Sequence, residues 1–345
     1  MPFVEESFGS EPNVAILPEP METAVKAVSV IIPVKEINDY ARDAVRCVHA
    51  LYPDSEILLV PDHRTPEELM GATVIPSWPE VAPGKKRDLA ARYAHGEILA
   101  FLDDDAYPGE NWLEEALVHF ERDDIAAVGG PGVTPPSNDR NQRASGWILA
   151  SFLGSGWCTY RFRPGTRQIV DDFPSMNLLV RKSDFNAVNG FDSGYWPGED
   201  SDFCRKLVNE TGRQIIYEPN ALVYHHRRPV FRGHLRQQAR YGLHRGHFAR
   251  RFSGNSRHVS YAVPALFTLG LVAGLLVSLY SQLGMVLYLS VLGVYAASLG
   301  ATALWVWYHE RDLVLTALVV GGTFVTHLTY GISYIRGLLT KELAH

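Results

Sequence analysis

One long stretch without charged side chains constrains this chain most. From His258 to His309 the sequence contains no Asp, Glu, Lys or Arg. Two membrane-spanning helices of about 20 residues each need that much apolar sequence. Buried helices of a soluble protein are the alternative, but runs this long and uncharged favour a membrane. We therefore expect a transmembrane region at 259–345 with two to three helices, over about 262–280, 285–308 and 313–335.

Charge is divided unevenly along the chain. Residues 219–345 carry 12 Lys and Arg against 3 Asp and Glu, although the whole chain has a net charge of −6. Nine arginines lie between Arg227 and Arg257, directly before the first apolar run. Such asymmetry indicates binding to nucleic acid or to lipid. Because the run borders predicted membrane helices, we expect anionic membrane lipids as partners and no nucleic acid.

The same arginines predict the orientation of the chain. The positive-inside rule places them in the cytoplasm, and with them the large N-terminal part of a multi-pass protein of the cell membrane. No cleavable signal peptide is expected at 1–25, because this segment has five glutamates, four prolines and no apolar core. We expect it to be a flexible acidic tail. Cys47, Cys158 and Cys204 are then expected to be reduced.

Strand and helix patterns alternate between residues 26 and 228. Ala27–Pro33 is a β-branched run typical of a buried parallel strand, and Tyr40–Leu51 follows with helical spacing. This alternation predicts an α/β fold with an open, mostly parallel sheet. Ligands of such sheets bind beyond the carboxyl ends of the strands. We also expect strands at 56–60, 97–102, 126–128 and 221–224, and helices at 85–95, 111–120 and 201–209.

Two acidic groups stand at positions where such a sheet binds ligands. Asp103, Asp104 and Asp105 follow the apolar strand 97–102, and adjacent carboxylates are costly unless a cation or water neutralises them. Oxygen ligands of this kind suit Mg²⁺ or Mn²⁺, often shared with phosphate. A solvated acidic turn is the alternative. Glu199 and Asp200 precede the helix 201–209, where carboxylates are also ordinary capping residues.

Together these motifs resemble the family 2 glycosyltransferases of the GT-A fold. The similarity follows the family order across about 200 residues. It departs at Pro61-Asp62, where the family has paired aspartates, and at Lys35-Glu36, where it has an aromatic residue and Asn. The matching segments are 30–34, 56–60 with Asp62, 86–90, 96–98, 101–105, 176–181, 190–192, 198–200 and 223–226.

The resemblance implies a Rossmann-like GT-A catalytic domain at 26–228. This domain would transfer a sugar, with inversion, from a nucleotide-diphosphate donor of UDP or GDP type. Asp200 matches the catalytic base that takes the proton from an acceptor hydroxyl, and Glu199 stands beside it. The nucleotide sugar would contact residues at the strand ends and in the DxD motif, namely Pro33, Glu36, Asp62, Arg87, Asp103 and Asp104.

The same resemblance implies a metal site for Mg²⁺ or Mn²⁺. Asp105 would bind the metal, Asp103 would contact metal or ribose, and a histidine about this far beyond the base completes the site in some relatives. His225 is our first choice for that histidine over His226. The alternative is that both histidines belong to the basic segment that follows.

A basic segment at 229–258 precedes the membrane region. Arg232, Arg236 and Arg240 recur every four residues, as on one helix face, while Phe231, Leu235 and Phe248 are apolar. This pattern predicts an amphipathic helix lying on an anionic leaflet.

The acceptor site is expected to include residues of this basic segment and one tryptophan. Gln237, Arg240 and Tyr241 resemble the Gln-x-x-Arg-Trp motif of processive membrane synthases, with Tyr for Trp; there the motif sits beside the acceptor glycan and the diphosphate. Trp196 lies four residues before Asp200, and its ring face suits stacking on an acceptor sugar. Trp147 and Trp157 are weaker candidates, with burial in the core as the alternative.

These inferences favour one function and leave two alternatives open. The leading hypothesis is a membrane-anchored, metal-dependent inverting glycosyltransferase of cell-envelope glycan biosynthesis, acting on a hydroxyl of a lipid-linked or glycan acceptor. A processive polysaccharide synthase is the alternative within the same class, although two or three membrane helices are few for a polysaccharide channel. A catalytically silent nucleotide-binding membrane protein is the alternative of another class.

Overall fold

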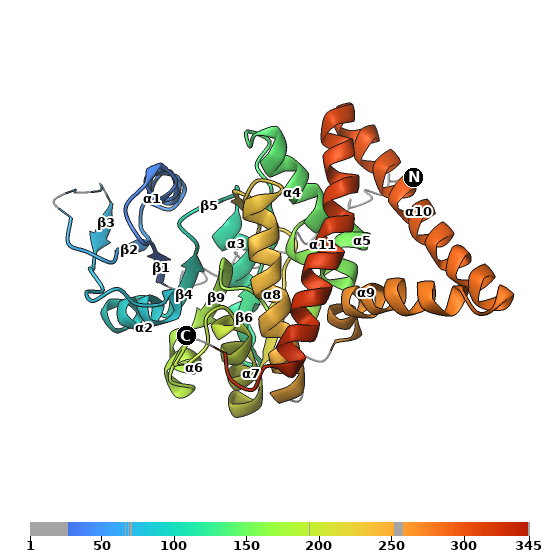
Figure 1. The fold of residues 1–345 in the computed structure, drawn as a ribbon. Coiled ribbons are helices and arrows are strands. Elements are labelled where there is room, and N and C mark those ends of the chain that lie inside the picture. Colours follow the sequence, from blue (N-terminus) through green and yellow to red (C-terminus); the bar gives the residue numbers. More distant parts are fainter. Residues whose placement is uncertain are drawn as a thin grey trace, which may run out of the picture.

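The computed structural model describes residues 27–343 except 66, 68, 70, 193 and 252–257. It shows an α/β domain followed in the chain by four long helices (Figure 1). The acidic tail expected at 1–25 and part of the basic segment lie outside the described residues.

Eight strands form the main sheet in the order β3-β2-β1-β4-β9-β6-β10-β8. The neighbouring strands β3, β2, β1 and β4 are parallel to one another, which confirms the predicted α/β fold with a largely parallel sheet. Strand β9 runs antiparallel to both β4 and β6, a feature that the alternating pattern did not reveal. The strands are β1 (Val28–Pro33), β2 (Glu56–Val60), β3 (Ala72–Val74), β4 (Ile98–Leu102), β6 (Ile125–Gly129), β8 (Gln168–Val170), β9 (Asn177–Arg181) and β10 (Gln214–Tyr217).

Helices cover both faces of this sheet. Strand β1 is buried along its whole length, so Val30 packs in the core on one face and Ile31 in the core on the other. The first face is covered by α1 (Asp39–Leu51) and α3 (Trp112–Leu117). The second is covered by α2 (Pro83–Tyr93), α6 (Lys182–Ala187) and α7 (Glu199–Thr211). The remaining helices of the domain are α4 (Arg140–Ala150), α5 (Phe152–Ser155), η1 (Val118–Glu121) and η2 (Gly156–Arg161).

A second, three-stranded sheet brings distant parts of the chain together. Its order is β5 (Ala106–Pro108), β11 (Val223–His225) and β7 (Gly132–Val133). Strand β5 follows the aspartates that end β4, and Ala106 pairs with His225 of β11. The pairing therefore places His225 beside the aspartates, more than 100 residues away in sequence.

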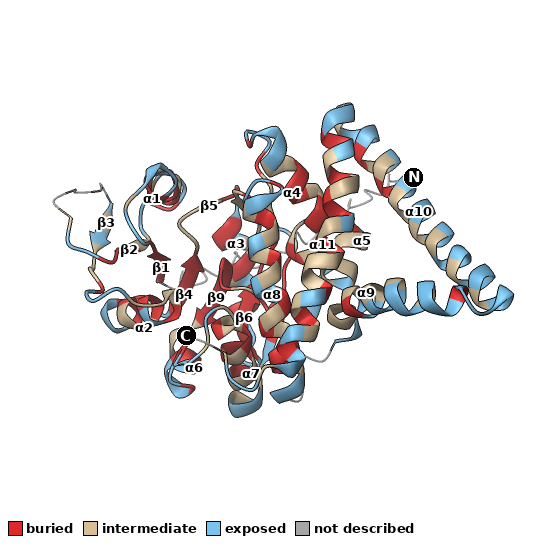
Figure 2. Cartoon of the chain, in the orientation of Figure 1, coloured by how far each residue is buried: buried red, intermediate tan, exposed pale blue. Residues whose placement is uncertain are grey.

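The three apolar runs all form helices that are long and apolar enough to cross a membrane. They are α9 (Val259–Ser278), α10 (Gln282–Glu310) and α11 (Leu313–Leu339), so each of the three expected apolar segments is helical. Helices α9 and α10 are mostly exposed, whereas buried positions recur along α11 (Figure 2).

Helix α8 (Arg232–Arg251) forms within the basic segment, with a different buried face from the one expected. Arg232, Arg236 and Arg240 are exposed on one face, as predicted. The prediction of its apolar face is wrong, because Phe231 is 41% exposed while Phe248 is buried. Helix α8 instead buries a face rich in His and Gly, and several of these residues contact α11: His234, Gly242, Gly246 and His247.

Candidate active site

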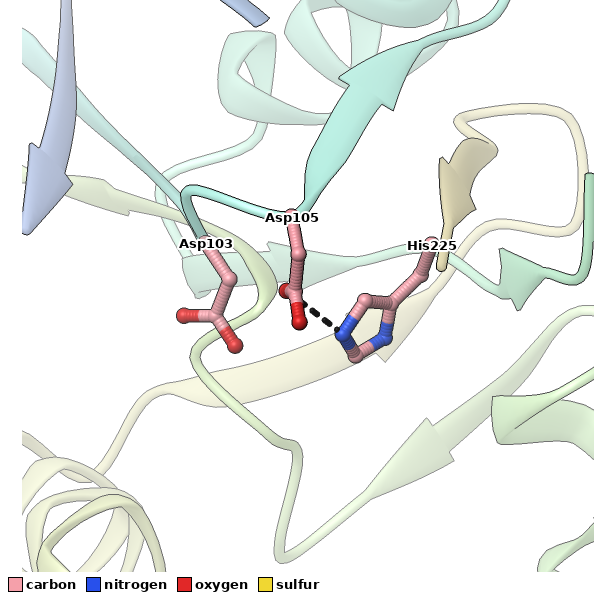
Figure 3. Close-up of side chains that lie close together, drawn as sticks. All are labelled: Asp103, Asp105 and His225. Carbon is pink, nitrogen blue, oxygen red and sulfur yellow. Dashed lines mark ion pairs between the residues drawn. The ribbon is translucent and has the colours of Figure 1, made fainter. Parts of the chain in front are cut away.

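The metal-ligand types expected from the sequence meet at the carboxyl end of β4. The ligand atoms of Asp103, Asp105 and His225 all lie within 4.8 Å of one another. Asp105 stands between the other two, and its Oδ1 is 3.0 Å from His225 Nε2 (Figure 3). Burial disfavours the charge on Asp105, but His225 and the nearby arginines 228 and 227 outweigh it and hold the pKa of Asp105 below its ordinary value. Two carboxylates and an imidazole here offer ligand types that suit a divalent cation.

The second ring nitrogen of His225 is also occupied. Arg227 Nη1 lies 3.0 Å from His225 Nδ1, and a guanidinium can only donate. In this arrangement Nδ1 accepts, and the hydrogen sits on Nε2, pointing toward Asp105. A metal on Nε2 requires that hydrogen to move to Nδ1, so Arg227 must then give up its contact.

His226 is turned away from this group. Its Nδ1 lies 2.6 Å from Asn138 Nδ2, and its ring packs against Tyr40 and Tyr107. Both histidines stand at β11, before the arginine-rich helix begins at Arg232.

Arg87 connects two acidic groups that the sequence places far apart. It is 3% exposed, and its Nη2 donates to Asp103 Oδ1 at 2.7 Å. Its Nη1 lies 3.5 Å from Glu199 Oε1 at the start of α7. One buried cation therefore holds the DxD motif and the second acidic motif in a single site.

Glu199 and Asp200 occupy the first turn of α7. The backbone requires a glycine at the position just before this helix. Gly198 has a φ of 115°, and a Cβ there would lie 2.3 Å from the Phe248 ring of α8. Burial, and then the charge of Asp200, raise the pKa of Glu199 to about 7. Burial, and then the charge of Asp172, raise the pKa of Asp200. Both carboxylates are therefore better proton acceptors than ordinary surface acids.

Asp172 is a site residue that the sequence reasoning missed. It is 1% exposed and lies 2.6 Å from Arg245 of α8 and 3.3 Å from Arg161. Its Oδ1 accepts from Ser201 Oγ at 3.1 Å, next to Asp200. Burial opposes its charge, but Arg245 and Arg161 lower the pKa of Asp172 to about 2. A sequence signal existed, because Arg245 breaks the four-residue spacing of the exposed arginines and so faces another side of the helix.

Of the three α8 residues expected at the acceptor site, Tyr241 lies near the carboxylates. Gln237 Nε2 donates to Tyr241 Oη at 3.1 Å. Loss of hydration of its hydroxyl, and then the charges of the nearby carboxylates Asp200 and Asp103, raise the pKa of Tyr241 to about 12. Arg240 stacks on the ring of Trp196, with 4.4 Å between guanidinium carbon and ring centroid.

The other two tryptophans differ from each other in burial. Trp157 is 78% exposed and contacts Phe152, so its burial in the core is excluded. Trp147 is partly buried against Trp305 of α10 and packs on an apolar cluster, as the core alternative expected, and its Nε1 donates to Glu310. Trp196, half exposed and stacked under Arg240, is the one that borders the site.

The expected nucleotide contacts lie around the ends of β1 and β2. Asp62 is 2% exposed and forms an ion pair with Lys86, which also donates to Val34 O at 2.6 Å. Glu36 is exposed and lines a cavity of about 230 Å³ at these strand ends, whereas Pro33 is buried. Asn38 donates to Asp104 at 3.1 Å, while burial and the adjacent Asp105 raise the pKa of Asp104 to about 6.

Comparison with known proteins assigns the chain to a family. The sequence model of "Glycosyl transferase family group 2" matches residues 98–319, which is more than half of the chain and includes both acidic motifs. The chain belongs to this family. The match confirms the resemblance that the sequence motifs indicated.

Two relatives support the same assignment. The pre-mycofactocin glycosyltransferase of Mycobacterium tuberculosis is 32% identical over 203 residues, covering 59% of this chain and 41% of that protein. The glucosyl-dolichyl phosphate glucuronosyltransferase of Haloferax volcanii is 26% identical over 148 residues, covering 40% of this chain and 46% of that protein. The chain thus spans less than half the length of these relatives.

A mannosyltransferase from Pyrobaculum calidifontis, solved with GDP-Man and Mn²⁺, has a similar fold. The TM-score is 0.57 at 18% identity, covering 89% of this chain and 88% of that chain. This family 2 chain therefore has the GT-A glycosyltransferase fold, followed by the three long apolar helices.

Proposed function

We propose that this family 2 chain is a membrane-anchored, metal-dependent inverting glycosyltransferase. It moves a sugar from a nucleotide-diphosphate donor to a hydroxyl of a lipid-linked or glycan acceptor. The observation that carries the proposal is one arrangement of charges: the aspartates at the end of β4 and the carboxylate pair of α7 flank the buried Arg87. Carboxylates clustered this closely cost free energy unless a bound substrate or cation compensates their charge.

The end of β4 fits a divalent cation. Asp103 and Asp105 offer the oxygen ligands that suit Mg²⁺ or Mn²⁺, and His225 adds a nitrogen once Arg227 releases its ring. Such a cation, when bound, offsets the charge that develops on the departing diphosphate. The Mn²⁺ in the archaeal mannosyltransferase supports this assignment.

The donor nucleotide is assigned to the ends of β1 and β2. Glu36 lines the cavity there, Pro33 ends β1, and Asp62 stands two residues after the end of β2. Arg87, Asp103 and Asp104 then face the donor from the β4 side. The GDP-sugar of the archaeal mannosyltransferase supports a donor of UDP or GDP type.

Asp200 is assigned as the catalytic base. An acceptor hydroxyl is a poor nucleophile at neutral pH, and a carboxylate that takes its proton contributes roughly 10²–10⁴-fold in rate. The Ser201 backbone N–H donates to Asp200 Oδ1 at 2.8 Å and fixes that oxygen. Glu199, near Arg87, orients rather than accepts the proton. One displacement inverts the anomeric carbon, so no enzyme nucleophile is required.

The acceptor enters beside α8. Trp196 and Arg240 offer a stacked pair for a sugar face, while Tyr241, which accepts from Gln237, lies near the carboxylates. The name of the Haloferax volcanii relative, which includes glucosyl-dolichyl phosphate, supports a lipid-linked acceptor. We assign residues 26–228 to catalysis, 229–258 to the membrane surface and 259–345 to anchoring.

The anchored chain faces the cytoplasm in this proposal. The arginines that precede α9 favour that side and contact anionic lipids. Two ion pairs tie the turn between α10 and α11 to α4 of the domain. Arg140 Nε lies 2.7 Å from Asp312 Oδ2, and Arg143 pairs with Glu310. This turn is therefore on the same side of the membrane as the active site.

The direct test is turnover by the purified chain. We would incubate it in detergent with UDP- and GDP-sugars, with a membrane lipid extract as acceptor, and measure nucleotide-diphosphate release. The expected result is release that the acceptor stimulates and EDTA abolishes, with one sugar added per acceptor. Polymeric product would favour a processive synthase. Nucleotide binding without release from any donor would contradict the proposal in favour of a silent binding protein.

A further inference from the structure

Helix α11 is buried by the rest of the protein to a greater extent than the other long apolar helices. In the most apolar part of each helix, 6% of the residues are buried in α9, none in α10 and 33% in α11. Helix α9 leads away from the domain, α10 returns to it, and α11 then runs along the domain beside α8 (Figure 1). The buried positions of α11 recur every three or four residues, as a continuous stripe on one face (Figure 2).

The domain and α8 contact α11 along its length, from its first turn to its last. Leu315 and Val319 pack in one apolar cluster with Ile148 of α4. In the middle, Thr326 Oγ1 lies 2.9 Å from His234 Nε2 of α8. Just after the last turn, the Thr340 carbonyl oxygen lies 3.1 Å from His247 Nδ1.

Helices α8 and α11 also approach at backbone distance. A Cβ on Gly242 would lie 2.6 Å from the Tyr330 carbonyl oxygen, and one on Gly246 would lie 2.1 Å from the Tyr334 carbonyl oxygen. From the other side, a Cβ on Gly337 would lie 2.0 Å from the Leu243 carbonyl oxygen. The two helices therefore sit at the same depth, wherever the membrane lies.

That shared depth conflicts with a spanning α11. The free face of α8 carries Arg232, Arg236 and Arg240, and arginine is strongly disfavoured in the hydrocarbon core. We propose that α11 does not cross the bilayer. It lies in the membrane surface on the side of the domain, while α9 and α10 form the hairpin that crosses. This inference rests on the membrane anchoring proposed above.

The uncovered face of α11 has the chemistry of a lipid contact. Leu313, Val314, Phe324 and Ile332 are 38–73% exposed on it, and the neighbouring helix α9 is apolar throughout. The hairpin has the length and ends of a spanning pair. Helix α9 has 20 residues, or about 30 Å, which matches the hydrocarbon core. Aromatic residues of the interface type stand at both ends: Tyr280 at the tip, Trp307 and Tyr308 at the domain.

The inference predicts that both ends of the chain lie on one side of the membrane. We would place protease-cleavable tags at residue 1, at Gln282 and after residue 345, and treat sealed right-side-out cells with protease. Protection of both terminal tags with cleavage at 282 is the expected pattern. Cleavage of the C-terminal tag while the residue 1 tag is protected would overturn the inference, because α11 would then cross.

Failure of the underlying proposal gives different patterns. If both terminal tags are cleaved and 282 is protected, the cytoplasmic orientation is wrong, but α11 still does not cross. Recovery of the full chain in the soluble fraction would overturn the anchoring and this inference together.

A depth measurement tests the lipid contact itself. We would label Val314→Cys, Phe324→Cys and Ile332→Cys with a fluorophore in vesicles whose lipids carry bromine near or far from the headgroup. Native Cys47 and Cys158 would be replaced by Ser, and Leu276→Cys on α9 is the matched control. Equal, shallow quenching at the three α11 positions supports the inference. Deep quenching at 324 with shallow ends indicates a span, and no quenching at all three indicates cover by another protein copy; both overturn it.

Discussion

Arg87 donates to Asp103 at 2.7 Å and so holds the DxD motif against the start of α7. The guanidinium is buried, and its other side is 3.5 Å from Glu199. The site is therefore built around a cation that belongs to the protein. The carboxylates of Asp103 and Glu199 lie on either side of it.

Arg87→Ala is expected to destabilise the folded chain by about 3 kcal/mol, because removing one partner of a buried ion pair leaves the other charges uncompensated. Nucleotide affinity should fall as well. Thermal unfolding in detergent measures the first effect. Arg46→Ala is the matched control: its ion pair with Asp43 is exposed, so a loss below about 1 kcal/mol is expected. Equal losses in both variants would contradict the central place of Arg87.

Nucleotide-diphosphate binding is expected to depend on Mg²⁺ or Mn²⁺ through Asp105. Asp105→Ala should weaken metal-dependent binding about 100-fold or more, since a ligand oxygen and its charge are lost. Titration calorimetry with the nucleotide and metal, with and without EDTA, measures it. Asp123→Ala, at an exposed turn, should bind as the parent does. Tight, EDTA-insensitive binding by Asp105→Ala would reject the metal assignment.

His225 is expected to matter less than Asp105, because Arg227 competes for its ring. His225→Ala should weaken metal-dependent nucleotide binding about 10-fold, the lower end for loss of a supporting group. The same titration compares the two variants. A larger loss for His225→Ala than for Asp105→Ala would mean that the histidine is the principal ligand.

The sequence predicted the strands that carry the site better than it predicted contacts between them. β2 matches its expected range, and β1 and β4 match within one residue, because continuous apolar runs bounded by Pro or Asp leave little freedom. Strand β9, antiparallel in the middle of the sheet, could not be inferred, since its pairing is set by partners far away in sequence.

Site residues divide in the same way. Asp103 and Asp105 were found because they share one motif at a strand end. Asp172 and Arg245 were missed because neither belongs to a motif, and only the packing of α8 on the domain brings them within 2.6 Å. The buried face of α8 was predicted wrongly because tertiary contact with α11, rather than lipid, covers its histidines and glycines.

Stability is expected to depend on pH through Glu199. Its pKa is raised to about 7 in the folded protein, so between about pH 4.5 and 7 the folded chain binds more protons than the unfolded chain. The free energy of unfolding should therefore fall as pH rises through this range, by about 1 to 3 kcal/mol from this group. Thermal unfolding of the parent and Glu199→Gln in EDTA, compared across pH, isolates it. A constant difference between the two would contradict the raised pKa.

The turn between α10 and α11 is expected in the cytoplasm, because Arg140 and Arg143 hold it against the domain. His309→Cys, in the last turn of α10 beside it, should react with a membrane-impermeant maleimide only after cells are permeabilised. Gln282→Cys at the far tip should react in intact cells. Equal labelling of both positions in intact cells would reject this arrangement.

The central claim is that Asp200 takes the proton from the acceptor. Asn at this position keeps the size and one oxygen but cannot accept the proton. Asp200→Asn should therefore lose transfer by at least 10²-fold. Nucleotide and metal binding should stay within a few-fold of the parent, since the proposed metal ligands are Asp103 and Asp105. Glu199→Gln is the control and should be milder, because Glu199 orients.

Turnover and nucleotide affinity, measured side by side for these two variants, test the account most directly. The account predicts that Asp200→Asn binds nucleotide normally and no longer transfers sugar. Normal turnover by Asp200→Asn, or loss of turnover in Glu199→Gln alone, would show that the base is a different carboxylate.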